Sequence, residues 1–169
     1  MPLDKIGRVV IIAGSDSDKE HIDKIAQSLD SYGLGYEVHI CSAHKQPVAC
    51  ADLIHRLNEE TSPLVVIAVA GGTDALSGTL SWELYHPVIS CPPEGIANQS
   101  PLNNPKGSSN ATIYKPENVG RFVAQIYASS HPIVQAALLL GIEKKCDELS
   151  KADIKIREAY ARSSRGGTS

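Results

Sequence analysis

The feature that most constrains this chain is an alternation of short apolar runs with longer segments of helical periodicity. The runs Val9–Ala13 and Leu64–Val69 are continuously apolar and rich in β-branched residues, as is typical of strands that are covered on both faces. Two further strands are predicted over Tyr36–Cys41 and Pro87–Cys91. Because helical segments separate these runs, we predict an α/β fold, in which a doubly wound parallel sheet forms the middle of three αβα layers.

The predicted helices carry their apolar residues on one stripe. Ile22 and Ile25 belong to this stripe in the first helix, and the segment from Val48 to Glu60 reads as the second. A short fifth strand is predicted over Thr112–Tyr114, and a helix over Val119–Tyr127. The whole arrangement is of the flavodoxin-like type, with one core that a chain of 169 residues is long enough to bury.

The end of the chain is predicted to be one long extra helix. It opens at Pro132 and runs to about Tyr160, which at 1.5 Å per residue is about 40 Å, comparable with the diameter of the domain. A helix so long cannot cover only its own core, so we expect it to pack on a neighbouring subunit. The alternative is a helix that folds back at a break near Gly141. The expected apolar stripe comprises Ile142, Cys146, Leu149, Ala152 and Ile156.

These elements divide the chain into parts with different expected roles. A single domain is predicted over residues 1–162, with its core at about 7–130 and the oligomerisation helix at about 131–160. The polar, Gly-rich stretch 163–169 is expected to be a disordered tail.

The composition argues against several classes of function. The formal net charge is −3, from 16 Lys and Arg against 19 Asp and Glu, which favours neither nucleic acid nor a membrane surface as partner. The four cysteines lie far apart without a CxxC pair, so we expect buried, reduced thiols rather than a metal site or disulfides. No signal peptide and no membrane-spanning stretch is recognisable. The expectation is a cytoplasmic protein.

Irregular, polar motifs follow the predicted strands directly. In an open parallel sheet the carboxyl ends of the strands share one edge, and ligands bind there. The first motif is Gly14-Ser15-Asp16-Ser17-Asp18. Glycine, two hydroxyls and the start of a helix favour a phosphate, and Asp18 could accept hydrogen bonds from sugar hydroxyls. An ordinary capped turn without a ligand would explain the motif equally well.

The second motif, Ser42-Ala43-His44-Lys45-Gln46-Pro47, is the main candidate for the chemistry. Lys45 and Ser42 could complete a phosphate clamp, and His44 would stand beside it. An imidazole has an ordinary pKa of about 6.5, so it can take and return a proton near neutral pH. A lone histidine is more often structural, and we assign that reading to the five others, His21, His39, His55, His86 and His131.

The polar segments after the third and fourth predicted strands carry few ionisable groups. Gly71, Gly72, Thr73 and Asp74 follow the third strand and could border a small, mostly neutral pocket for an uncharged substrate or a flat ring. Close packing of strand against helix is the alternative. The polar stretch 94–111 is long for a loop inside a compact domain, which favours a functional role.

Taken together, these motifs resemble the phosphoribosylaminoimidazole (AIR) carboxylase family of de novo purine synthesis. The resemblance covers nearly the whole chain and rests on the order and spacing of four motifs. They are Gly14-Ser15-x-Ser17-Asp18, Ser42-Ala43-His44-Lys45, Ala70-Gly71-Gly72 and Pro87-Val88-Ile89-Ser90-Cys91-Pro92-Pro93.

The resemblance implies a single AIR carboxylase domain that acts on 5-aminoimidazole ribonucleotide and CO2, needs no cofactor and assembles as a homo-octamer. His44 would be the general acid-base group and Asp18 the ligand of the ribose. Gly71–Asp74 would border the CO2 pocket, and the stretch after Pro93 would close over the ring. The implied phosphate ligands are Ser15, Ser17, Ser42 and Lys45.

The family has two branches. One carboxylates the ring directly with CO2, whereas the other is a mutase that moves a carboxyl group from the exocyclic nitrogen of N5-carboxyaminoimidazole ribonucleotide to the ring carbon. Lys45, the run Ile89–Pro93 and the long C-terminal segment are similar to the CO2 branch, and the mutase branch has histidine where this chain has Ala75. The segments Gly72–Ala75 and Ser100–Pro105 depart from the CO2 branch. A non-catalytic nucleotide-binding module of flavodoxin-like fold is the alternative of another class.

Overall fold

The computed structural model describes residues 6–163, whose centre is a five-stranded parallel sheet with the strand order β2-β1-β3-β4-β5. This confirms the predicted fold. The register of the central pair sets Val10 of β1 opposite Val66 of β3. The strands are β1 (Ile6–Ala13), β2 (Leu34–Ile40), β3 (Leu64–Val69), β4 (Val88–Ser90) and β5 (Asn110–Thr112).

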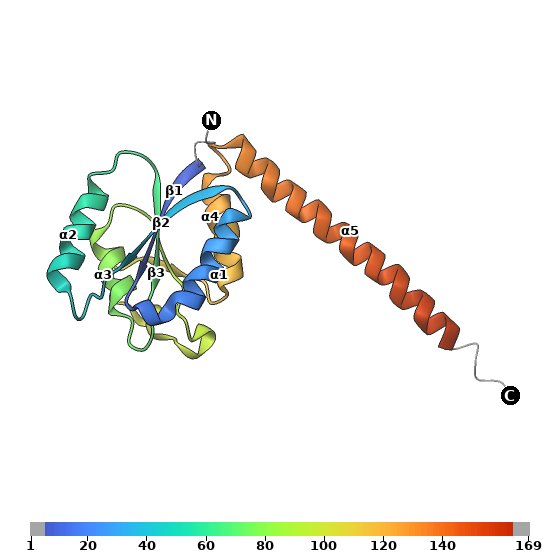
Figure 1. Cartoon of the computed structure of the whole chain (residues 1–169), viewed down its shortest axis with the longest axis horizontal. Helices are drawn as coiled ribbons and strands as arrows, with labels where there is room; N and C mark the ends of the chain where they lie inside the picture. The colour runs from blue at the N-terminus through green and yellow to red at the C-terminus, as the bar shows by residue number, and fades with distance from the viewer. Residues whose placement is uncertain (1–5, 164–169) are drawn as a thin grey trace.

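Helices cover both faces of the sheet (Figure 1). Side chains of a strand point alternately to the two faces. Val9 and Ile11 of β1 therefore belong to one core cluster, whereas Val10 and Ile12 belong to the other. Helices α1 (Lys19–Asp30) and α4 (Val119–Tyr127) pack on the first face, and α2 (Pro47–Asn58) and α3 (Ala75–Glu83) on the second.

Helix α3 is not among the helices predicted from the sequence. Its buried face is made of Leu76, Ser77, Leu80 and Ser81, so serine stands at half of the positions where a periodic pattern needs an apolar residue. Where a predicted strand or helix differs from the observed one, the difference lies at its ends. The fifth strand, for example, is Asn110–Thr112 and begins two residues earlier than expected.

Helices α1 and α4 approach each other closely at Gly120. Its N–H donates to the Ser28 hydroxyl at 2.9 Å, and a Cβ at this position would clash with the carbonyl group of Ser28. Only glycine leaves room for this approach. The contact fixes the layer that lies over β1 and β3.

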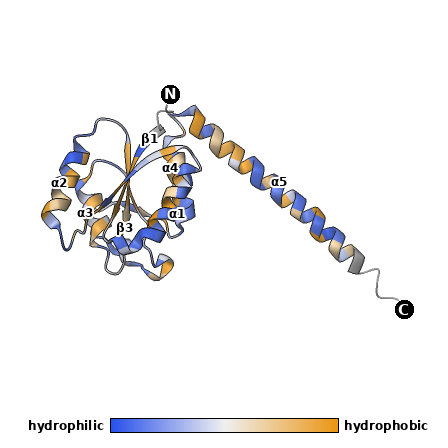
Figure 2. Ribbon diagram, in the orientation of Figure 1, coloured by the Kyte–Doolittle hydropathy of each residue, from blue (hydrophilic) through white to orange (hydrophobic). Residues whose placement is uncertain are grey.

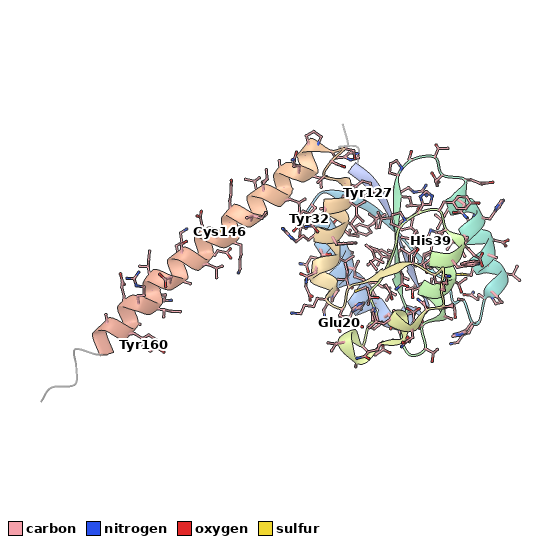
Figure 3. All side chains as sticks on the ribbon, turned by 180° about the vertical axis from the view of Figure 1, so that it is seen from behind. Glu20, Tyr32, His39, Tyr127, Cys146 and Tyr160 are labelled. Atoms are coloured by element: carbon pink, nitrogen blue, oxygen red, sulfur yellow. The ribbon has the colours of Figure 1, made fainter. Side chains whose placement is uncertain are left out.

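Helix α5 (Pro132–Ser163) runs for 32 residues without a break at Gly141, so the folded-back alternative is not observed. Val134 and Leu138 are buried against the domain, and beyond them the helix projects away from it (Figure 1). Hydrophobic residues recur along the projecting part (Figure 2), and Cys146 and Tyr160 extend from it (Figure 3). The exposed apolar side chains include Leu139, Leu140, Ile142, Leu149, Ile154, Ile156 and Tyr160.

The predicted disordered tail lies outside the described residues, except for Ser163, which is the last residue of α5. None of the helices within residues 6–163 has the combination of length and apolar character that crossing a bilayer requires.

Candidate active site

A cavity of about 360 Å³ opens at the carboxyl edge of the sheet. Loops that follow four different strands contribute to its wall, so the motifs predicted to converge on one edge do so. The lining residues are Gly14, Ser15, Ser17, Asp18, Ser42, Ala43, His44, Lys45, Ala70, Gly71, Thr73, Ala75, Leu76 and Glu94.

The loop after β1 presents two hydroxyls and a carboxylate to this cavity. Ser15 caps the short 3₁₀ turn Asp16–Asp18 by accepting from the Ser17 N–H at 3.2 Å, and the two serine hydroxyls lie 2.8 Å apart. Burial, and next the charge of Glu94, raises the pKa of Asp18. Ser15 is thus the residue that caps this turn, whereas Asp18, at the start of α1, makes no capping hydrogen bond to that helix.

The loop after β2 is folded by its own hydrogen bonds. The Ser42 hydroxyl accepts from the Lys45 N–H at 3.2 Å, and the Ser42 carbonyl accepts from the Gln46 N–H at 2.8 Å. Pro47 then starts α2. The side chains of His44 and Lys45 are exposed and make no hydrogen bond or ion pair with any residue from 6 to 163. An imidazole and an ammonium are therefore available to a ligand.

Asp74 lies behind the cavity and does not line it. Its buried carboxylate accepts from the Ser77 N–H at 2.8 Å, from the Ser77 hydroxyl at 2.6 Å and from the Ser90 hydroxyl at 3.0 Å. These contacts cap α3 and join it to the end of β4. Of the predicted pocket residues after β3, Gly71 and Thr73 line the cavity, whereas Gly72 and Asp74 do not.

Glu94 is the lining residue with an ionisable side chain that sequence reasoning missed. Its Oε1 accepts from the Gly72 N–H at 2.8 Å, and its Oε2 accepts from the Asn98 side-chain amide at 3.2 Å. Burial raises the pKa of this carboxyl, but the hydrogen bonds from Gly72, from its own backbone and from Asn98 together outweigh burial and lower the pKa. Its position directly after the Pro92-Pro93 end of a strand was the available signal.

A second side chain of the same stretch fastens the loop after β3. The Ser100 hydroxyl accepts from the Asp74 N–H at 2.9 Å and lies 3.1 Å from the Gly72 carbonyl oxygen. Asn98 contacts both Glu94 and Ser100. Residues 94–100 thus hold the backbone of residues 72–74 from two sides.

A larger cavity, of about 560 Å³, lies at the opposite edge of the sheet. Its cation, Arg8, is already paired: one guanidinium nitrogen lies 2.8 Å from Glu37 Oε1, and the other contacts Glu60. Hydrogen bonds to Glu60 and Glu37 raise the pKa of Arg8. Tyr127 contributes its ring to the wall and donates its hydroxyl to the Arg8 carbonyl at 2.8 Å.

His21 contacts Cys91, the residue that follows β4, through its ring nitrogen. His21 lies with Nε2 3.0 Å from the carbonyl oxygen of Cys91, and burial lowers the pKa of its imidazole. Burial also raises the pKa of the Cys91 thiol to about 12. Among residues 6–163, no three His, Cys, Asp or Glu side chains are grouped so as to hold a metal ion.

The chain is similar to known proteins both in sequence and in fold. Residues 8–147 match the family model of AIR carboxylase. The chain is 35% identical over 156 residues to the human bifunctional phosphoribosylaminoimidazole carboxylase/phosphoribosylaminoimidazole succinocarboxamide synthetase; the match covers 89% of this chain and spans only 37% of that relative. The phosphoribosylaminoimidazole carboxylase of Archaeoglobus fulgidus is 33% identical over 155 residues, which cover 89% of this chain and 85% of that protein. The crystal structure of Treponema denticola PurE superposes with a TM-score of 0.82 at 27% identity, covering 88% of this chain and 98% of that one.

Proposed function

The chain belongs to the AIR carboxylase family, and on this premise we propose that it adds CO2 to 5-aminoimidazole ribonucleotide (AIR) without a cofactor. The product would be 4-carboxy-5-aminoimidazole ribonucleotide (CAIR), an intermediate of purine biosynthesis. One observation carries the proposal: His44, Lys45 and the serine-lined first loop meet at a single cavity at the carboxyl edge of the sheet.

The proposed nucleotide site uses the charges that the loops leave free. Lys45 and the hydroxyls of Ser15, Ser17 and Ser42 hold the phosphate, since an ammonium and hydroxyl donors together make charge-assisted hydrogen bonds to it. Asp18 accepts from the ribose hydroxyls. Three of these five groups lie on the loop after β1 and two on the loop after the neighbouring strand β2, which suits a ligand as small as one nucleotide.

The proposed ring and CO2 site lies at Gly71 and Thr73. These small residues leave room for a flat ring and a linear molecule against the backbone. Holding CO2 next to the ring carbon removes much of the entropic barrier to their reaction. The stretch after Pro93 closes this side of the cavity, a role supported by Glu94, which lines the cavity.

The proposed chemistry needs a single proton transfer by the protein. The aminoimidazole is an enamine, so its ring carbon attacks the carbon of CO2 and one new carbon–carbon bond forms. This ring carbon then carries both a hydrogen and a carboxylate. His44 removes that proton, the electron pair of the C–H bond returns to the ring, and aromaticity is restored.

The choice of the CO2 branch over the mutase rests on Lys45, on the run Ile89–Pro93 and on Ala75, which stands where the mutase has histidine. The test is to supply AIR with bicarbonate and no ATP and to follow the ultraviolet absorbance of the product. A carboxylase turns over at low bicarbonate, whereas a mutase does so only at very high bicarbonate. Tight AIR binding with no turnover at any bicarbonate concentration would instead favour a non-catalytic nucleotide-binding module.

The proposal includes a homo-octamer in which α5 packs on neighbouring subunits. It is supported by the projecting helix, whose apolar residues Ile142, Leu149 and Ile156 are exposed among residues 6–163. Light scattering coupled to size-exclusion chromatography measures the assembly, and an Ile142→Asp/Leu149→Asp variant should shift it toward smaller species. A cytoplasmic location is also proposed, in keeping with four free cysteines.

A further inference from the structure

The carboxylate of Glu94 lies on the Gly71–Gly72 turn; Glu94 and Gly71 line the cavity, whereas the N–H of Gly72 is occupied by Glu94. Its Oε1 accepts from the Gly72 N–H at 2.8 Å, and a Cβ added to Gly71 would lie 2.7 Å from the same oxygen. Gly72 has a φ of +65°, a left-handed conformation that favours glycine. The loop is therefore shaped around a carboxylate that another loop supplies.

A backbone N–H in such a turn can hold an anion. Backbone N–H groups in successive turn conformations form concave sites that hold phosphates and carboxylates. Here the position holds a carboxylate of the chain itself. Under the proposed function, which this inference deepens, the same turn borders the place where the ring carbon acquires its carboxylate. Glu94 and the carboxylate of CAIR would then compete for one N–H.

The contacts of Glu94 allow it to leave. The residue is exposed, and its side chain is held within the described residues by two hydrogen bonds to other residues, the longer of them 3.2 Å from the Asn98 amide. The charge of Glu94 reaches the rest of the cavity, because it contributes to raising the pKa of Asp18. A second carboxylate arriving at Gly72 would meet this charge at close range.

We propose that Glu94 is a specificity-determining residue, an internal carboxylate that occupies the position of the product's carboxylate. It must move off Gly72 before CAIR binds. The uncarboxylated AIR has no group for this position and does not compete with Glu94. The residue thus makes the site selective for AIR over CAIR and assists release of the product.

The test compares the two nucleotides in a His44→Ala background, which prevents their interconversion, by isothermal titration calorimetry. Glu94→Ala is expected to tighten CAIR binding about tenfold, because a charge-assisted hydrogen bond becomes free for the ligand, while AIR binding stays within about twofold. Glu94→Gln keeps an oxygen that can accept from Gly72 but removes the charge, so a smaller gain is expected. Asp16→Asn removes a carboxylate beside Asp18 that does not line the cavity, and it should leave the ratio of the two affinities unchanged.

Each other outcome is decisive. Parallel weakening of AIR and CAIR by Glu94→Ala would mean that Glu94 only holds the loop, and weakening of AIR alone would make it a direct ligand of the substrate; either result overturns the inference while the proposed function stands. If Glu94→Ala fails to fold, the AIR-to-CAIR ratio of Glu94→Gln decides in the same way. If the folded His44→Ala parent binds neither nucleotide, the proposed function fails, and this inference with it.

Discussion

The two edges of the sheet carry two cavities, and the larger one is the poorer candidate for catalysis. At the amino edge, about 560 Å³ is lined by a cation, Arg8, that already has two carboxylate partners. At the carboxyl edge, about 360 Å³ is lined by Lys45 and His44, whose side chains have none within residues 6–163. A charge that is already paired gains little from a ligand. In this protein, ionisable side chains without a partner therefore indicate the candidate active site better than cavity volume does.

The difference follows from how the chain turns at each edge. At the carboxyl edge, loops rich in glycine and serine lead into helices and present the side chains of His44 and Lys45, which have no partner within residues 6–163, to the cavity. At the amino edge, side chains such as Tyr127 and Arg8 join the layers to one another. Substitutions at the carboxyl edge should therefore affect binding and catalysis, and those at the amino edge stability.

The largest effect is expected for His44→Ala. Loss of a positioned acid-base group should lower kcat by about 10² to 10⁴, while the Kd for AIR changes by less than about threefold, because the imidazole is not a ligand of the phosphate. Initial rates and calorimetry measure the two quantities. His55→Ala, on the exposed face of α2, is the matched control and should leave both unchanged. Equal losses of rate and binding would make His44 structural.

Lys45→Ala should raise the KM for AIR about tenfold with a smaller change in kcat, since the phosphate loses a charged partner. The steady-state rate at saturating bicarbonate measures both constants. Lys19→Ala serves as the control: this lysine is paired with Asp23 and does not line the cavity. An unchanged KM for Lys45→Ala would remove Lys45 from the proposed phosphate site.

At the amino edge, Arg8→Met should leave kcat/KM within about twofold and lower the free energy of unfolding by about 1 kcal/mol, because partly exposed ion pairs contribute little. The corresponding fall in Tm is about 2 to 4 °C, and it should shrink in 1 M salt, which screens the pairs. Calorimetric melting and the carboxylation assay measure these effects. A large loss of activity would show that the amino edge takes part in the chemistry.

The smallest effect is a gain in stability for Asp18→Asn. Burial and the charge of Glu94 raise the pKa of Asp18 in the folded state. A raised pKa stabilises the fold most at low pH, below the unfolded value, and this contribution is lost as the pH rises through the folded pKa. Removing the charge should therefore raise Tm at pH 7 by about 1 to 2 °C but not at pH 3, while it weakens AIR binding. A fall in Tm at pH 7 would contradict this reading.

The parts of the structure that depend on local residue patterns could be predicted from the sequence. The buried strand Leu64–Val69 has the predicted ends, because a continuous apolar run can only lie between two layers. The convergence of the loops also followed, since parallel strands share one edge for their carboxyl ends. Such reasoning placed His44, Lys45 and the first loop around one cavity.

Features that depend on contacts between segments distant in the sequence could not be predicted in this way. Asp74 was expected beside the ligand, but its carboxylate is buried. There it accepts a hydrogen bond from Ser90, which lies 16 residues later in the chain. The role of Glu94 depends on Gly72, which lies 22 residues earlier, across a loop that has no periodicity to interpret. Helix α3 was missed because two serines stand on its buried face.

The distribution of thiols gives the chain a built-in chemical reporter. Cys41, Cys50 and Cys91 are buried, and burial raises the pKa of Cys50 to about 11, whereas Cys146 is exposed on α5. Alkylating reagents attack the thiolate of accessible cysteines. On the unmodified chain they will therefore label Cys146 selectively while α5 is bare, and a fall in the labelling rate with rising protein concentration will show directly that another surface has covered the helix.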